Sequence, residues 1–100
     1  MKIPKRPTDP FEYKPKELEG VTVNMKPLSV GTYDQCTGLI LNKEHPAALR
    51  LAAYEGVTGW SGFDEAFSLE ELKKCEDAFV YELGGAVLSG AQITETEKNS

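Results

Sequence analysis

The chain has 100 residues, of which 40% are hydrophobic and 27% are charged, and its formal net charge is −5. A chain of this length forms one domain, because a single core usually serves roughly 50 to 250 residues, and this composition is too apolar for a wholly disordered protein. The acidic balance argues against a nucleic-acid partner, since binding to phosphates needs a clustered basic surface.

Residues 1–19 are predicted to form an extended arm. Four of the six prolines of the chain lie in it: Pro4, Pro7, Pro10 and Pro15. Prolines at this density block both a helix and the interior of a sheet. Phe11 and Tyr13 lie on the same side of an extended backbone, where they either pack back onto the core or contact a neighbouring molecule.

The start of the chain is basic and the remainder is acidic. Residues 1–16 carry five basic and two acidic side chains, whereas residues 17–100 carry six basic and fourteen acidic ones. The basic residues are interpreted either as a solvated tail that aids solubility or as a contact for the acidic body of a neighbouring copy. The second interpretation predicts self-association that salt weakens.

A half-buried strand is predicted at residues 21–26, directly after Gly20. Apolar and polar residues alternate there in the run VTVNMK, which is the period-two pattern of a strand with one buried face. A single strand is not stable. We therefore expect it to pair either with the arm around Phe11 and Tyr13 or with the same strand of another copy.

Two helices and a structured loop are predicted in the middle of the chain. From Ser29 the apolar spacing becomes helical, and a second helix is predicted over residues 46–55, with Gly56 directly after its end. Residues 56–67 contain three glycines and three large aromatic side chains, which indicates a tightly turned loop. We expect Trp60 to be largely buried and to anchor this loop against the helices.

The strongest local signal is a capping box at Ser68. Its hydroxyl is expected to accept a hydrogen bond from the N–H of Glu71, while the carboxylate of Glu71 reaches back. The helix that begins there is predicted over residues 69–83, with Gly84-Gly85 ending or loosening it. Residues 94–100 are predicted to be a polar tail.

The predicted fold class is therefore α+β. It is a small, mainly helical domain over residues 20–93, with about three helices and a short N-terminal strand or hairpin. No apolar run approaches the roughly 20 residues of a membrane helix, and no apolar run follows the N-terminal charges as in a secretory signal. We expect no membrane partner and a location in the cytoplasm.

No residue pattern predicts a catalytic site, a bound metal or a cofactor. His45 is the only histidine, and beside Pro46 it is interpreted as a surface or capping residue. Zinc needs about four N or S ligands, whereas His45, Cys36 and Cys75 supply three. The two cysteines are expected to be buried free thiols, with a disulfide between them left open. We therefore expect that the protein is not an enzyme.

Two motifs in the second half of the chain resemble a known family. The runs GWSG at residues 59–62 and FSLEEL at residues 67–72 are similar to the Gly-Trp turn and the helix start of small tail assembly chaperones of long-tailed bacteriophages. Residues 21–28 resemble the strand that opens those domains, and residues 97–99 resemble their polar ending. Residues 63–67, between the two motifs, are fewer than in many members.

This resemblance implies a chaperone that coats the long helical tape measure protein while the tail tube polymerises around it. Its partners would be the tape measure protein and the tail tube protein. It would act in the cytoplasm of an infected or lysogenic bacterium and be absent from the mature virion. The alternatives are a structural component of the phage tail or head–tail connector, and a small bacterial adaptor unrelated to phages.

A coat of this kind has to bind an apolar helical surface weakly and many times, which suits aromatic anchors and multivalency. The candidate partner-binding residues are the large aromatic ones of the arm and of the glycine-rich loop: Phe11, Tyr13, Trp60, Phe63 and Phe67.

Overall fold

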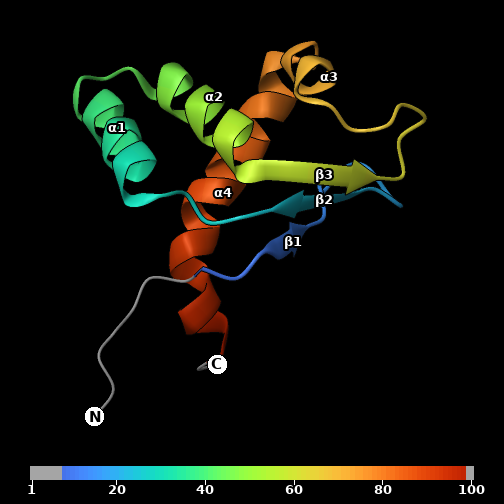
Figure 1. The fold of residues 1–100 in the computed structure, drawn as a ribbon, viewed down its shortest axis with the longest axis horizontal. Helices are drawn as coiled ribbons and strands as arrows, with labels where there is room; N and C mark the ends of the chain where they lie inside the picture. Colours follow the sequence, from blue (N-terminus) through green and yellow to red (C-terminus); the bar gives the residue numbers. More distant parts are fainter. Residues whose placement is uncertain (1–7, 99–100) are drawn as a thin grey trace.

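The computed structural model describes residues 8–98, with only the backbone described for residues 91–98. In this part of the chain, helices pack beside a three-stranded antiparallel sheet (Figure 1), which confirms the predicted α+β class. The elements are β1 (Phe11–Tyr13), β2 (Thr22–Met25), α1 (Val30–Leu41), α2 (His45–Gly56), β3 (Val57–Ser61), α3 (Leu69–Lys73) and α4 (Asp77–Lys98).

β2 is the middle strand of the sheet, with β1 and β3 antiparallel on either side of it. Its alternating residues place Val23 and Met25 on the buried face and Asn24 on the exposed face, as the sequence pattern predicts. Both neighbouring strands belong to the same chain. The strand therefore needs no second copy for its stability, and this reason for expecting self-association does not hold.

The predicted arm contributes β1, so it is not separate from the domain. β1 pairs with β2 in a register that places Phe11 opposite Met25 and Tyr13 opposite Val23. Both aromatic side chains pack against the core rather than extending away from it. The prolines that flank β1 suit a short edge strand, where an N–H is not needed for the ladder. Residues 1–7 of the predicted arm lie outside the described residues.

β3 replaces part of the loop that was predicted over residues 56–67, and that prediction was wrong for the strand residues. β3 pairs with β2 so that Val23 lies opposite Trp60 and Asn24 lies opposite Gly59. Glycines lower the strand propensity of this run, but propensity in a strand depends on the partner that is available. Here β2 supplies a paired backbone and a buried face.

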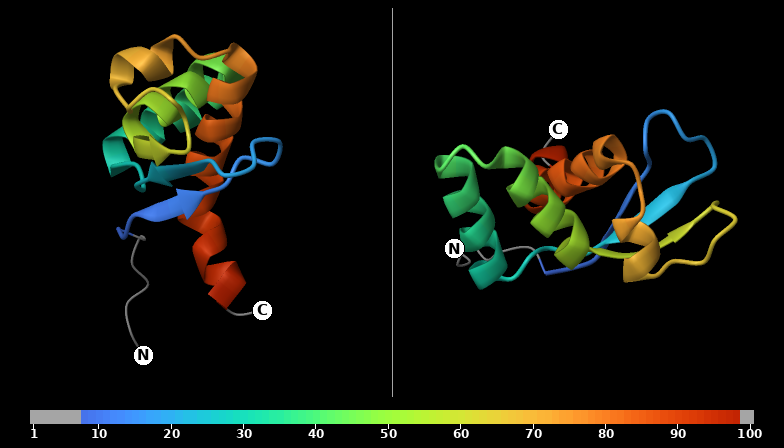
Figure 2. Two further views of the ribbon diagram at one scale, coloured as in Figure 1. Left: turned by 90° about the vertical axis from the view of Figure 1, so that its right-hand side faces the viewer. Right: turned by 90° about the horizontal axis from the view of Figure 1, so that it is seen from above.

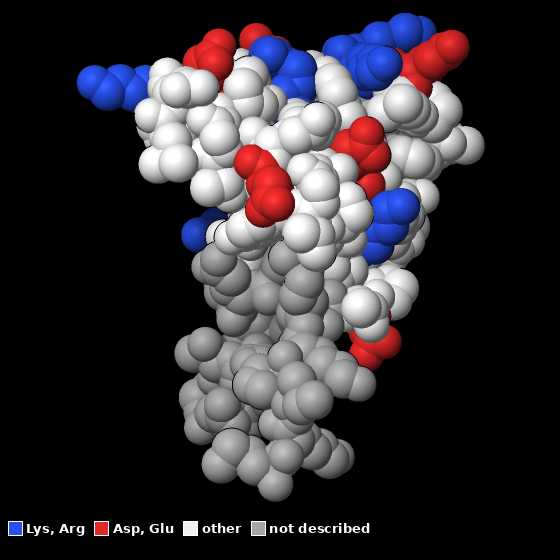
Figure 3. Space-filling view, turned by 60° about the vertical axis from the view of Figure 1, so that its left-hand side comes forward, with Lys and Arg blue, Asp and Glu red and all other residues white. Residues whose placement is uncertain are grey.

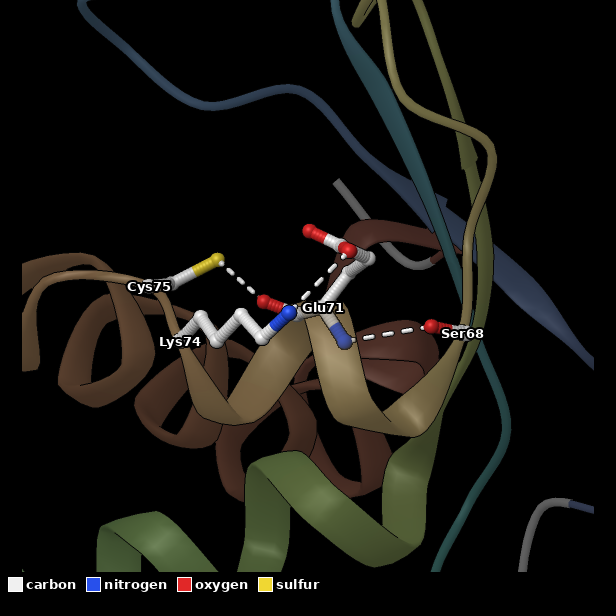
Figure 4. Close-up of polar contacts among 4 residues, drawn as sticks. All are labelled: Ser68, Glu71, Lys74 and Cys75. Carbon is white, nitrogen blue, oxygen red and sulfur yellow. Dashed lines mark hydrogen bonds and ion pairs between the residues drawn. The ribbon is translucent and has the colours of Figure 1, made fainter.

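The helix predicted over residues 69–83 is two helices, α3 and α4, so the predicted continuity was wrong. Ser68 caps α3 as predicted, with its hydroxyl accepting from the N–H of Glu71 at 3.1 Å (Figure 4). The N–H groups of Lys74 and Cys75 then bond to carbonyls three residues back, which tightens and ends the helix. The Glu71 carboxylate pairs with Lys74 at 3.6 Å rather than reaching back to Ser68.

α4 continues through Gly84-Gly85, which were predicted to end or loosen a helix. Gly84 lies so close to the backbone of Leu49 in α2 that a Cβ atom would overlap the Leu49 carbonyl oxygen. In the same contact, the side chain of Val87 occupies the space beside Gly56. The glycines allow α2 and α4 to approach closely, and the packing gained outweighs the low helix propensity of glycine.

α4 is the long helix against which both α2 and the sheet pack (Figures 1 and 2). Its backbone extends to Lys98. Residues 94–98, predicted as part of a polar tail, are therefore helical, while residues 99–100 lie outside the described residues.

The core lies between β2, α2 and α4. Its side chains with no exposed surface include Val23, Met25, Ala52, Leu83 and Val87. Among the described residues, no charged or polar side chain is buried. The free energy of folding therefore comes mainly from apolar burial, at about 25 cal/mol per Å² removed from water.

Gly84→Ala is expected to destabilise the domain by about 1–3 kcal/mol, the typical cost of forcing atoms into a packed core. The new methyl group would meet the backbone of Leu49, which has no side-chain rotation to relieve the overlap. Gly85→Ala is the matched control, because its Cβ atom would have only the Leu49 Cδ2 atom near it, at 4.0 Å.

The control should stabilise α4 by up to about 1 kcal/mol through the higher helix propensity of alanine. Urea unfolding of both variants measures the two effects. Equal changes in the free energy of unfolding would contradict the close α2–α4 contact.

Candidate functional site

Four aromatic rings gather where β3, the following loop and α4 meet. Trp60 contacts Phe63 edge-on, with ring centroids 5.1 Å apart and planes at 75°, and it contacts Phe67 at 4.9 Å and 89°. Phe63 in turn contacts Phe79 of α4 at 5.9 Å and 84°. Edge-to-face pairs of this kind stabilise by about 0.5–1.5 kcal/mol each beyond their buried area. The rings therefore hold the loop after β3 in one position.

The local sequence explains why this loop turns back at the end of β3. Gly62 has a φ angle of +96°, which favours glycine, and its backbone lies so close to Gly20 that a Cβ atom would overlap the Gly20 carbonyl oxygen. The indole N–H of Trp60 donates to the backbone carbonyl of Glu65 at 2.9 Å. The first contact brings the β1–β2 loop and the loop after β3 together, and the second turns the loop after β3 back toward Trp60.

Trp60 is partly buried and packs against the hydrophobic core. It lies near the end of β3, where its ring contacts Phe63 and Phe67 edge-on. The expected contact of Trp60 with the core is therefore confirmed, but Trp60 makes it from a strand and not from a loop. As a residue of β3, Trp60 continues one row of the sheet.

A cavity of about 500 Å³ opens beside this ring cluster and is called the Trp60 cavity below. Its apolar and aromatic walls come from the β1–β2 loop, β3, the loop after β3 and the start of α4. Five carboxylates and no basic side chain line it. The lining residues are Glu17, Leu18, Trp60, Phe63, Glu65, Glu71, Cys75, Glu76, Ala78, Phe79 and Glu82.

Two of the five carboxylates have partners. Glu71 forms its ion pair with Lys74 (Figure 4), and Glu82 accepts a hydrogen bond from the Tyr13 hydroxyl at 2.6 Å. Glu17, Glu65 and Glu76 form no ion pair and no side-chain hydrogen bond with the rest of the described chain. The cavity thus combines aromatic surface with uncompensated negative charge, an arrangement that attracts a cation.

The two thiols are free, which resolves the alternative left open by the sequence. Burial raises the pKa of the Cys36 thiol, which donates to the carbonyl of Ala48 at 3.6 Å. Burial, and then the charge of Glu71, raises the pKa of the Cys75 thiol at the Trp60 cavity. Both thiols are protonated at neutral pH and are therefore weak nucleophiles.

The histidine, the potential metal ligands and the helices of residues 8–98 were each considered for other functions. His45 is exposed at the first turn of α2 and does not line the Trp60 cavity. The described residues contain no group of three or more His, Cys, Asp or Glu side chains placed to hold a metal ion. In the same part of the chain, no helix combines the length and the apolar character needed to cross a membrane.

A second candidate surface lies on the outer side of α1. Val30 and Leu41 are 55% and 77% exposed, and Ile40 is 36% exposed beside them. Val30 and Leu41 are eleven residues apart, three helical turns, so they lie on the same side of α1, with the exposed polar residues Asp34 and Thr37 between them. We call Val30, Ile40 and Leu41 the α1 stripe.

α1 lies at the edge of the molecule (Figure 1), and uncharged side chains cover most of the surface between scattered charges on this side (Figure 3). A shallow groove of about 450 Å³ lies between α1 and α2, with Leu39 and Leu51 among its walls, and none of the three stripe residues lines it.

The five predicted site residues separate into two groups. Trp60, Phe63 and Phe67 come together at the Trp60 cavity. Phe11 and Tyr13 lie elsewhere on the buried face of the sheet, toward α4, and Tyr13 approaches the cavity only through Glu82.

Sequence reasoning missed the carboxylates of the cavity, Phe79 and the α1 stripe. Phe79 has helical core spacing, and the carboxylates come from two loops, α3, the turn after α3 and α4, so no local pattern unites them. The sequence did not predict the α1 stripe, because apolar residues occur on every side of that helix and no single apolar face stands out.

The hydrogen bond from Tyr13 to Glu82 makes the stability of the sheet–α4 contact depend on pH. Burial, then this hydrogen bond and the charge of Glu82, raises the pKa of Tyr13 from 10.0 to about 12. The folded state holds the proton more tightly than the unfolded state. The resulting stabilisation is complete below pH 10.0 and is lost as the pH rises toward about 12.

Tyr13→Phe removes the ionisable group, so the variant should lack this part of the pH dependence. The difference in free energy of unfolding between the two proteins should be constant below pH 10.0 and should shrink toward pH 12. Urea unfolding at a series of alkaline pH values measures it. Parallel stability curves across that interval would contradict a proton held by Tyr13.

The chain was compared with protein-family models, with curated proteins and with solved structures, and no comparison gave a match. The described residues form two candidate binding surfaces, the Trp60 cavity and the α1 stripe.

Proposed function

We propose that this protein is a tail assembly chaperone of a long-tailed bacteriophage, which binds apolar helical segments of the tape measure protein while the tail tube is assembled. The motifs at residues 59–62 and 67–72 support the family. The observation that carries the binding role is the α1 stripe, an exposed apolar surface on a helix that packs on one side only.

The stripe suits a helical partner. Val30 and Leu41 are three turns apart on one side of a single helix, so a second helix can pack across them, with side chains that also reach the groove beside Leu39 and Leu51. The contact is small for a protein–protein interface, so each one is weak. Many copies on one long partner supply the total strength through multivalency.

The role is one of binding, without catalysis. Both thiols are protonated at neutral pH, and the Trp60 cavity contains no histidine or lysine to act as a general base beside a nucleophile. In this proposal the protein acts in the cytoplasm of the infected or lysogenic bacterium. It leaves before the virion is complete, and the tail tube protein is the second partner.

Leu41→Ser tests the α1 stripe. Leu41 is 77% exposed, so the substitution should leave the fold intact, while the loss of a leucine from an interface should weaken binding by about tenfold to a hundredfold. The probes are helical peptides that cover the product of the very long gene expected beside this one. Isothermal titration calorimetry measures their affinity.

Leu69→Ser is the matched control, because Leu69 is also exposed, at 43%, but lies on α3 away from the stripe. It should bind the peptides as the unaltered chain does. Equal loss in both variants, or no binding of any peptide, would contradict the proposal. Mass spectrometry of purified virions addresses the structural alternative, since a tail or connector component is retained in the particle and a chaperone is not.

A further inference from the structure

We propose that the Trp60 cavity binds the N-terminal segment, residues 1–7, of a second copy of this chain. The copies would then associate head to tail, each offering one segment and one cavity. This inference goes beyond the proposed chaperone role and does not involve the α1 stripe.

The walls of the cavity suit a ligand with both proline rings and cations. Grooves lined by aromatic rings bind proline-rich segments in the polyproline II conformation. Trp60, Phe63 and Phe79 supply such rings. The uncompensated carboxylates of Glu17 and Glu76 select a positively charged ligand over a neutral one, and a guanidinium group also binds well against an indole face.

The N-terminal segment has both features. Its sequence is MKIPKRP, with Pro4 and Pro7 at the P-x-x-P spacing that such grooves bind. Polyproline II has three residues per turn, so two prolines three apart lie along one edge of the helix. Lys2, Lys5 and Arg6 are its charged residues, and the segment contains no acidic residue.

The direction of β1 favours a second copy over the segment's own cavity. β1 runs from Phe11 to Tyr13, and the chain then continues to Glu17 and Leu18, which line the cavity. The described chain therefore enters the sheet, before Phe11, at the end remote from the cavity (Figure 1). A proline-rich segment without glycine resists the reversal that would bring it back along the sheet.

Sedimentation velocity of the full chain tests the association. At low salt the average mass should rise with protein concentration, and at high salt it should fall toward that of the 11.0 kDa monomer as the charges are screened. A strict monomer at every concentration in low salt would overturn the proposal.

Two full-length variants locate the contact. The segment-neutral variant carries Lys2→Gln, Lys5→Gln and Arg6→Gln. The cavity-neutral variant carries Glu17→Gln, Glu65→Gln and Glu76→Gln, all at exposed positions where the fold should tolerate them. Each variant should self-associate about tenfold more weakly, as the loss of three exposed ion pairs implies.

The matched control changes three other exposed carboxylates on the α1–α2 side of the molecule. It carries Asp34→Asn, Glu44→Gln and Glu55→Gln, and alters the net charge by the same amount as the cavity-neutral variant. It should associate as the unaltered chain does. An equal loss of association in this control would mean that net charge, and not the Trp60 cavity, governs the contact, and would overturn the proposal.

Mixing the two neutral variants distinguishes a segment–cavity contact from any other interface. The segment-neutral chain keeps an intact cavity, and the cavity-neutral chain keeps an intact segment. An equimolar mixture should therefore form a one-to-one heterodimer that grows no further. Each variant alone, at the same total concentration, should contain less dimer than the mixture. Failure of the mixture to form this heterodimer would overturn the proposal.

The single tryptophan of the chain reports on the cavity directly. A synthetic peptide of residues 1–8, added to the segment-neutral variant, should change the fluorescence of Trp60 and saturate. The same peptide with Pro4→Ala and Pro7→Ala should bind more weakly, because it loses the preformed polyproline conformation. A peptide that leaves the fluorescence unchanged would count against occupancy of the Trp60 cavity and overturn the assignment.

Discussion

The close contact between α2 and α4 is the constraint on which the rest of the structure depends. Gly84 allows the two backbones to approach, and Gly56 leaves room for the side chain of Val87. With the helices this close, Ala52 and Leu83 are fully removed from water. α4 then offers a further side to the sheet, so its position determines where β1 and β2 can pack.

The sheet connects the helix pair to the Trp60 cavity, because one row of its residues runs from α4 to the wall of the cavity. Tyr13, Val23 and Trp60 lie opposite one another across the three strands, in one row on the buried face. Tyr13 is hydrogen-bonded to Glu82 of α4, whereas Trp60, at the other edge, packs on the core and also lines the cavity. The row therefore begins as core packing and ends as the wall of a cavity. The chain breaks between α3 and α4, so Cys75 and Phe79 belong to different segments, and both segments line the cavity.

The two candidate surfaces differ in chemistry and in place. The Trp60 cavity combines aromatic rings with five carboxylates, whereas the residues of the α1 stripe are apolar. α1 and the loop after β3 lie at opposite ends of the longest axis of the molecule (Figure 1). A head-to-tail assembly through the cavity would leave every α1 stripe available. Repeated weak sites of that kind suit a long repetitive partner, because each additional contact is intramolecular.

The sequence by itself determined the features that depend on neighbouring residues. The alternation around Val23 predicted β2 and its buried face, Ser68 predicted the start of α3, and Gly56 predicted the end of α2 to within a residue. These features were predictable because a strand face, a cap and a helix end are set by side chains a few residues apart.

Tertiary structure decided what depends on partners far along the chain. Trp60 is in a strand because β2 lies beside it and pairs with it. Gly84 is tolerated within α4 because a residue without a side chain allows α4 to pack closely against the backbone of Leu49 in α2. The carboxylates of the Trp60 cavity come together only when its loops and helices meet. Local propensity carries no information on such contacts, since the free energy that selects them is released only when the distant segments pack.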